Sequence, residues 1–193
     1  DILMKDKDIE KAAKFLGESL KGLIEGEVGI PKLIITKALR GNYKNPKQIA
    51  HKVLADRIGR RDPGNKPSIG DRIPYVYFKN PDKKALQGDK IELPTFIEEQ
   101  NLEIDYSHYI TNQIMKPVQQ VFALVLEKMK LFRKKKGTTL RVWYDQLNKL
   151  KEKHPDEEVY KSRLETLRNR EVKALLFDDW LTRIENKRKG NGT

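Results

Sequence analysis

The sequence contains no cysteine and only three histidines, and both scarcities limit its chemistry. Without cysteine there can be no disulfide, thiolate zinc site or iron–sulfur cluster. His51, His108 and His154 are isolated from one another and show no metal-ligand spacing. We therefore expect no metal site, and no Ser, His and Asp set is indicated by spacing either.

Long hydrophobic runs are also missing. The chain has no stretch of about 18 apolar residues, the length that a membrane-spanning helix needs. Its first residues, DILMKDKDIEK, lack the apolar segment of a signal peptide. We expect a protein that is neither secreted nor inserted in a membrane.

Positive charge is plentiful and unevenly placed. Lys and Arg number 40 against 28 Asp and Glu, a formal net charge of +12 that favours a polyanionic partner. Residues 32–84 contain 14 of these cations and only 4 acids, a local excess of +10. A second basic block follows an apolar segment and is typical of a solvated face. It consists of Lys128, Lys130, Arg133, Lys134, Lys135 and Lys136.

Apolar spacing predicts helices over most of the chain. A helix is expected to begin after Asp8 and to end at Gly26. A second should run over residues 46–60, with Asn45 as N-cap, Pro46 at the first position and Gln48 as capping-box partner. A long helix over residues 106–129, capped by Asp105, should be kinked or divided by Pro117. From residue 138 the chain reads as helical again.

A short extended section interrupts the helices. Residues 33–36 are a β-rich run, and residues 72–79 read as a strand in which Pro74 favours an edge position. The turn-rich residues 62–71 connect the second helix to this strand. The predicted fold class is mainly α with a small β element.

Three motifs carry a resemblance to a known family. Residues 33–43 (LIITKALRGNY) and 50–78 (AHKVLADRIGRRDPGNKPSIGDRIPYVYF) resemble the thumb of family B DNA polymerases, especially the delta type. Residues 106–122 (YSHYITNQIMKPVQQVF) are similar to a helix of the same thumb with a Tyr-x-x-Asn-Gln-x-x-x-Pro pattern. The resemblance implies a helix joining palm to thumb at 1–30, a thumb core at 31–127 and a basic, Lys-rich helical C-terminal extension at 128–193. The cysteine-free extension is similar to polymerases of large DNA viruses.

The resemblance also implies which residues touch DNA. A thumb grips the primer-template duplex through its phosphates, without sequence specificity. The implied DNA-binding residues are Lys37, Lys47, His51, Arg57, Arg60, Arg61, Gly70 and Arg72. Gly70 would let the backbone approach closely. For each cation the competing interpretation is a surface charge or an intramolecular partner, for instance Arg72 with Asp71 or Asp62. The tyrosines Tyr43, Tyr75, Tyr106 and Tyr109 are expected in the core or at its rim.

The catalytic part of such an enzyme is not apparent in the sequence. The Tyr-x-Asp-Thr-Asp hairpin of the palm does not occur, nor does an exonuclease carboxylate set. The acid pairs Glu98-Glu99, Glu157-Glu158 and Asp178-Asp179 diverge by about 100° if helical, so neighbours do not converge on one metal. We expect no catalytic residue and no cofactor in this chain; the Mg²⁺ of the parent enzyme is implied for the palm.

The implied partners are primer-template DNA and the palm, fingers and exonuclease domains of the parent polymerase. A sliding clamp is a further candidate, although no Gln-x-x-aliphatic-x-x-aromatic-aromatic peptide occurs up to residue 193. The implied location is intracellular, in the nucleus or in a cytoplasmic viral factory. The alternative is a non-enzymatic basic module that binds nucleic acid or a partner protein.

Overall fold

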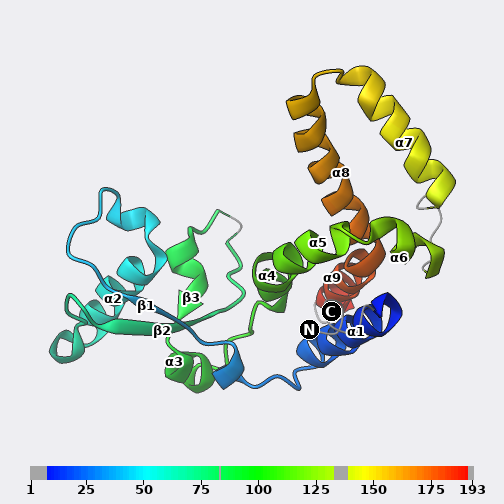
Figure 1. The fold of residues 1–193 in the computed structure, drawn as a ribbon. Helices are drawn as coiled ribbons and strands as arrows, with labels where there is room; N and C mark the ends of the chain where they lie inside the picture. Colours follow the sequence, from blue (N-terminus) through cyan, green and yellow to red (C-terminus); the bar gives the residue numbers. More distant parts are fainter. Residues whose placement is uncertain (1–7, 83, 133–138, 191–193) are drawn as a thin grey trace. The chain divides into compact units, whose positions relative to one another are not determined.

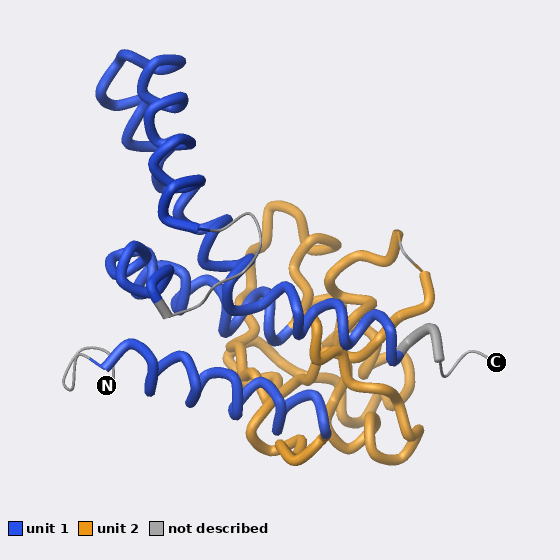
Figure 2. The backbone as a smooth tube through the Cα atoms, turned by 90° about the vertical axis from the view of Figure 1, so that its right-hand side faces the viewer, with its two compact units in different colours: residues 1–25, 109–193 blue, residues 26–108 orange. Residues whose placement is uncertain are grey.

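The computed structural model describes residues 8–82, 84–132 and 139–190. They form two compact units, each described by itself (Figures 1 and 2). Unit 1 comprises residues up to 25 and from 109 onward, and unit 2 comprises residues 26–108. The observed secondary structure is mainly helical with one small antiparallel sheet, as the sequence predicts. The predicted boundaries at residues 30 and 127 stay a prediction, since they divide the chain by role and not by compactness.

Unit 2 is built on a three-stranded sheet in the order β1-β2-β3. β1 (Ile35–Ala38) and β2 (Arg72–Tyr77) are antiparallel, and β3 (Ile91–Glu92) pairs only with the end of β2. α2 (Ala50–Arg61) packs on the face of the ribbon that bears Ile73 and Tyr75. The core cluster consists of Leu39, Leu54, Ala55, Ile73, Tyr75 and Ile91.

The remaining elements of unit 2 are short. Four 3₁₀ turns connect the strands and helices: η2 (Ile30–Lys32), η3 (Pro46–Gln48), η4 (Pro63–Asn65) and η5 (Gln87–Lys90). α3 (Pro94–Glu99) packs against β2, and α4 (Tyr106–Tyr109) begins beside the boundary between the units.

Three expectations for unit 2 are wrong in detail. The predicted helix over 46–60 begins only at Ala50, because Pro46–Gln48 form a separate 3₁₀ turn and Ile49 is extended (φ −95°, ψ 104°). Asn45 forms no side-chain cap there. The first strand lies two residues later than the run 33–36, because Leu33 still closes the preceding turn.

The third correction concerns Pro74, which was expected at a sheet edge but lies in the central strand. Its partner is Thr36 of β1. The Leu39 N–H donates to the Asp71 carbonyl, and hydrogen-bonded pairs alternate along the ladder. Pro74 and Thr36 therefore form a non-hydrogen-bonded pair, so the nitrogen of Pro74 points away from β1. On that other side β3 pairs only with Val76 and Tyr77, so no ladder hydrogen bond is lost at Pro74.

Unit 1 is a helical bundle with a projecting hairpin. Its elements are α1 (Ile9–Ile24), a π-helical turn (Ile110–Ile114), α5 (Met115–Ala123), α6 (Leu126–Phe132), α7 (Leu140–Lys153), α8 (Glu157–Leu176) and α9 (Asp178–Gly190). The Asp8 side chain accepts from the Lys11 N–H, and Gly26 follows α1 with φ 79°, so both predicted ends of this helix are confirmed. None of the described helices is long and apolar enough to cross a membrane.

The predicted long helix over 106–129 is divided, as Pro117 suggested. Asp105 caps its start by accepting from the His108 N–H at 3.0 Å. Pro117 has no N–H to donate, and its ring crowds the carbonyl of Gln113, four residues earlier. The π-helical turn Ile110–Ile114 lies at this place and interrupts the regular α-helix. A second break, between Ala123 and Leu126, has no sequence signal that we recognise.

A buried ion pair joins α6 to α8 in this bundle. The Lys130 Nζ atom donates to Glu171 Oε2 at 2.7 Å, and the two side chains are 0% and 8% exposed. The solvated role expected for the basic block of 128–136 is therefore wrong for Lys130. Arg133 to Lys136 lie outside the described residues. Glu127, one turn before Lys130, accepts from the Trp143 indole N–H at 3.1 Å, so α6 also holds the start of α7.

Replacing Lys130 by Met should destabilise the chain by about 3–5 kcal/mol, because the charge of Glu171 stays buried without its partner. Urea unfolding followed by circular dichroism measures the loss. The double variant Lys130→Met, Glu171→Gln should recover much of it. The matched control is Lys161→Ala on α8, the helix that carries Glu171. The ion pair of Lys161 with Glu157 is 69% and 79% exposed, so its loss should cost at most about 0.5 kcal/mol. Equal losses from Lys130→Met and Lys161→Ala would contradict the assignment.

Candidate nucleic-acid interface

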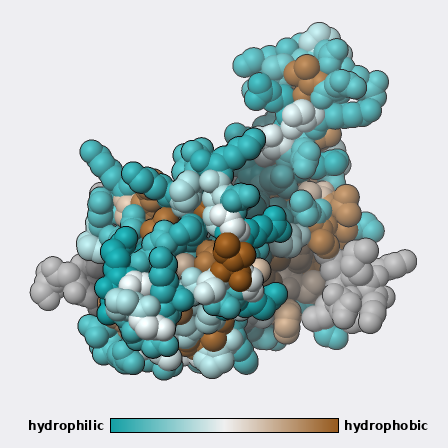
Figure 3. Space-filling model, turned by 90° about the vertical axis from the view of Figure 1, so that its left-hand side faces the viewer, coloured by the Kyte–Doolittle hydropathy of each residue, from teal (hydrophilic) through white to brown (hydrophobic). Residues whose placement is uncertain are grey.

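The predicted DNA-binding residues all lie in unit 2, on three elements and a turn. Lys37 is on β1, Lys47 on η3, and His51, Arg57, Arg60 and Arg61 are on α2. Gly70 and Arg72 lie at the turn into β2. Figure 3 shows a mainly hydrophilic surface with scattered hydrophobic spots. The structure places six of these eight residues in two groups, and Lys47 and Arg60 belong to neither.

The first group lies at one end of the β1–β2 ribbon. Lys37 is paired with Ile73, and Arg72 is paired with Ala38 in the next position of the ladder. The side chains of Lys37 and Arg72 therefore start from adjacent pairs and point to opposite faces of the ribbon. The Gly70 N–H donates to the Leu39 carbonyl at 2.8 Å, which places the turn beside the exit of β1. Arg40 follows directly. We call Lys37, Arg40, His51, Gly70 and Arg72 the basic ribbon end.

A hydrogen-bond chain ties the start of α2 to this end of the ribbon. The Arg40 N–H donates to the Tyr43 hydroxyl at 2.7 Å, and that hydroxyl lies 3.0 Å from His51 Nε2. Burial, followed by the charge of Lys37, lowers the pKa of His51, and the charge of Arg40 lowers it further. The neutral imidazole is thus the favoured form. Its lowered pKa also reports the positive field that the two cations create there.

The cations of this end are free of carboxylates. Lys37, Arg40 and Arg72 are exposed, and no ion pair joins any of them to an acid within the ranges that the structure covers. The competing interpretation for Arg72 named Asp71 and Asp62. Asp71 instead accepts from the Ser68 N–H, and Asp62 accepts from the Gly64 N–H and the Asn65 amide, so both carboxylates serve turns. Arg72 therefore forms an ion pair with neither of these two acids.

Gly70 has backbone geometry suited to a close approach. Its φ is +95°, in the region that side chains rarely adopt, while a Cβ atom built there would meet nothing within 4 Å. The glycine is therefore required by conformation and not by crowding, and its backbone faces open space beside Arg72. Lys47, on η3 before α2, and Arg60, in the last turn of α2, are also exposed.

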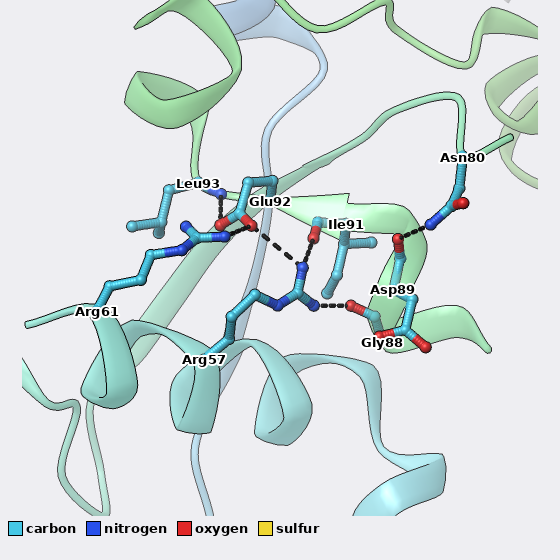
Figure 4. Close-up of polar contacts among 8 residues, drawn as sticks. All are labelled: Arg57, Arg61, Asn80, Gly88, Asp89, Ile91, Glu92 and Leu93. Atoms are coloured by element: carbon cyan, nitrogen blue, oxygen red, sulfur yellow. Dashed lines mark hydrogen bonds and ion pairs between the residues drawn. The ribbon is translucent and has the colours of Figure 1, made fainter. Parts of the chain in front are cut away.

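The second group has intramolecular partners (Figure 4). Arg57 donates to Glu92 Oε2 at 3.1 Å, to the Ile91 carbonyl at 3.3 Å and to the Gly88 carbonyl. Arg61 donates to the same Glu92 oxygen at 2.7 Å, and its guanidinium stacks 3.8 Å from the centroid of Phe96. The carboxylate is only 1% exposed, whereas Arg57 and Arg61 are 18% and 38% exposed.

The structure therefore supports the intramolecular interpretation for Arg57 and Arg61, and the DNA contacts expected of them stay a prediction. The sequence reasoning missed Glu92, which lies 35 residues after Arg57 and has no local signal of burial. It also missed Arg40, an exposed cation inside the recognised motif 33–43. Tyr75 and Tyr109 are buried, which confirms the core positions expected of them. Among the described residues, no group of three His, Cys, Asp or Glu side chains could hold a metal ion.

Comparison with known proteins identifies the family. Residues 1–125 match the family model for DNA polymerase family B. The chain is 45% identical over 197 residues to the DNA polymerase of Pyramimonas orientalis virus, across 99% of this chain and 16% of that protein. It is 46% identical over 132 residues to the DNA polymerase of Acanthamoeba polyphaga mimivirus, across 66% of this chain and 8% of that protein.

A cellular relative gives the same result. The chain is 33% identical over 130 residues to the DNA polymerase delta catalytic subunit of Candida albicans, across 67% of this chain and 12% of that protein. The chain belongs to DNA polymerase family B, which confirms the resemblance found in the sequence. It spans at most 16% of the length of these three relatives.

Replacing Arg57 by Ala should lower the stability of unit 2 by about 2–4 kcal/mol, because the buried Glu92 loses one of two partners and two carbonyls lose a donor. Arg60→Ala, an exposed neighbour on the same helix, should change it by at most about 0.5 kcal/mol. Hydrogen exchange of β2 and β3 amides reports the difference locally. If Arg57→Ala leaves exchange unchanged, the contacts with Glu92 do not hold α2 against β3.

Acid should weaken unit 2. Burial is the first cause that lowers the pKa of both His51 and His108 below the ordinary value of 6.5. Below about pH 6.5 these histidines bind protons in the unfolded chain but stay neutral in the folded one. The contribution of the neutral histidines to stability is therefore complete above about pH 6.5. It is lost as the pH falls toward their lowered pKa values. Urea midpoints at about pH 7.5 and 5.5 measure this. The double variant His51→Gln, His108→Gln should show a flatter dependence; an unchanged slope would exclude these histidines as its source.

Proposed function

We propose that this chain serves as the duplex-gripping thumb of a family B DNA polymerase. The observation that carries the proposal is the basic ribbon end. There, exposed cations from two strands and a linker form no ion pair with any carboxylate that the structure describes. Lys and Arg that neutralise phosphates release counterions, and this gives affinity without base preference. A polymerase that copies any sequence needs such tolerance.

The local charge supports a polyanion as the ligand. Residues 32–84, which include the whole ribbon end, carry 14 cations and 4 acids. α2 starts beside this end with no side-chain cap and no acid in its first turn. The N–H groups of a first turn favour an anion, so the helix start adds to the same field.

The division of roles follows from the contacts. Lys37, Arg40 and Arg72 would bind phosphates, with Gly70 allowing the backbone to approach. Arg57 and Arg61 would hold α2 against β3 and so fix the helix that positions His51. Nucleotide addition would belong to palm carboxylates and Mg²⁺ of the parent enzyme, because no convergent carboxylate group occurs among the described residues. The primer-template duplex and the other polymerase domains are the proposed partners.

Removing the cations of the ribbon end should flatten the salt dependence of duplex binding. The slope of log affinity against log salt is about −0.9 per phosphate neutralised, so Lys37→Ala, Arg40→Ala, Arg72→Ala should flatten it by about 2.7. The control with the same charge loss is Lys11→Ala, Lys14→Ala, Lys21→Ala on the exposed face of α1. Fluorescence anisotropy with a short duplex at several salt concentrations measures both. Equal flattening by the two triples would mean that binding follows net charge, and the thumb surface would be withdrawn.

A further inference from the structure

A pocket of about 310 Å³ lies between α7 and α8 in unit 1. The two helices form an antiparallel hairpin, which separates toward its base (Figure 1). Each helix lines the pocket with four residues spaced i, i+3, i+4 and i+7, a single helical face. The lining residues are Gln146, Lys149, Leu150 and Lys153 from α7, and Arg163, Thr166, Leu167 and Arg170 from α8. We call this the α7–α8 groove.

The composition of the groove is unusual for the inner face of a hairpin. A stripe with this spacing normally carries apolar residues that pack against the facing helix. Here only Leu150 and Leu167 do so, while four of the eight positions carry cations and none carries an acid. α7 and α8 together contain nine cations and six acids. All six acids therefore lie on helix faces outside the groove.

The groove cations also have no internal counter-charges. Lys149, Lys153, Arg163 and Arg170 form no ion pair within the described part of the chain, whereas the outward Lys161 pairs with Glu157 at 2.8 Å. Like charges that face one another across a hairpin oppose its closure. The groove therefore concentrates positive charge that no acid of the described residues compensates.

Gln146 adds a polar side chain to the groove. Its Oε1 atom is buried and has no hydrogen-bond partner among the described residues. Because this atom is not accessible, an external donor could reach it only after the side chain turned toward the groove. The feature that favours a ligand is therefore the charge of the groove, which is complementary to that of phosphates. The leucines supply an apolar floor between the two basic edges.

We propose that the α7–α8 groove binds the phosphodiester backbone of a single nucleic-acid strand. Lys149 and Lys153 are about 6 Å apart along α7, and Arg163 and Arg170 about 10.5 Å apart along α8. A stacked strand carries one phosphate per roughly 3.4 Å, so the groove matches about three phosphates. Nucleic acid, and not an acidic peptide, is the occupant because the chain belongs to a DNA polymerase family. In this respect the inference rests on the premise of the proposed function.

The family match does not supply this site. The family model ends at residue 125, before α7 begins, and the matches to the mimivirus and Candida albicans proteins cover about two thirds of the chain. The groove is also distinct from the basic ribbon end, which lies in unit 2. It would give the chain a second contact with nucleic acid, for an unpaired strand.

The test uses the full chain, a fluorescent oligothymidylate of about 12 nucleotides and a duplex of the same length. The groove triple Lys149→Ala, Lys153→Ala, Arg163→Ala should flatten the salt slope for the single strand by about 2, at about 0.7 per phosphate. The control triple Arg141→Ala, Lys151→Ala, Lys161→Ala removes the same charge from the same helices, outside the groove, and should have little effect. Equal effects would overturn the proposal.

Two further measurements keep the result interpretable. Lys153→Glu should weaken single-strand binding by tenfold or more, about 1.4 kcal/mol. Lys151→Glu, two positions away and outside the groove, should change it much less. The groove triple should also raise the melting temperature at low salt, because facing like charges are removed. Equal losses from Lys153→Glu and Lys151→Glu, or a melting temperature lower than that of the control triple, would contradict the groove assignment.

The remaining outcomes separate this site from the proposed thumb surface. If the ribbon-end triple leaves duplex binding intact while the groove triple weakens single-strand binding, the groove stands and the thumb surface fails. If the groove triple weakens only duplex binding, the strand assignment is wrong. If it weakens only the binding of a polyglutamate peptide, the occupant is an acidic protein segment and the proposal is overturned.

Discussion

The carboxylate of Glu92, shared between two guanidinium groups, is the interaction on which unit 2 depends. β3 is only two residues long and would contribute little as a strand by itself. Arg57 and Arg61, one turn apart on α2, bind its single acid and thereby attach the helix to the sheet (Figure 4). Gly88 permits the close approach, since a Cβ atom there would lie 2.6 Å from the Val53 Cβ. The start of α2, with His51, is positioned relative to the ribbon by this attachment.

The cations of the two motifs in unit 2 thus divide into two physical classes. Those with a buried acid in reach become part of the fold, and those without one keep their charge available to solvent. The same division occurs in unit 1. Lys130 pairs with Glu171 inside the bundle, whereas Lys149 and Lys153 of the α7–α8 groove form no ion pair with any described acid. Net charge alone does not distinguish these cases, because a buried pair contributes nothing to the external field at a distance.

Much of the architecture could be predicted because its signals are local. Asp8, Gly26 and Asp105 mark helix ends within three or four residues of the atoms they contact, and Pro117 perturbs its own turn. The family was recognisable for a similar reason, since its motifs are contiguous. The partners of Arg57, Arg61 and Lys130 lie 31 to 41 residues away, and no short-range pattern specifies them. The edge position predicted from Pro74 was wrong for the strand as a whole, because the sequence does not tell that β3 pairs only with the end of β2.

The two units differ in the point of synthesis at which all of their residues have been made. Unit 2 is continuous, so all of its contacts are available once residue 108 has emerged. Unit 1 is not, because α1 packs against α6 and α9 and cannot cover its apolar face until the last helix exists. Leu16, Leu20 and Leu23 must therefore remain without their native partners while the intervening unit is made. Ribosome-bound intermediates of this chain would expose an amphipathic helix beside an already folded domain, the situation in which a chaperone has the most to bind.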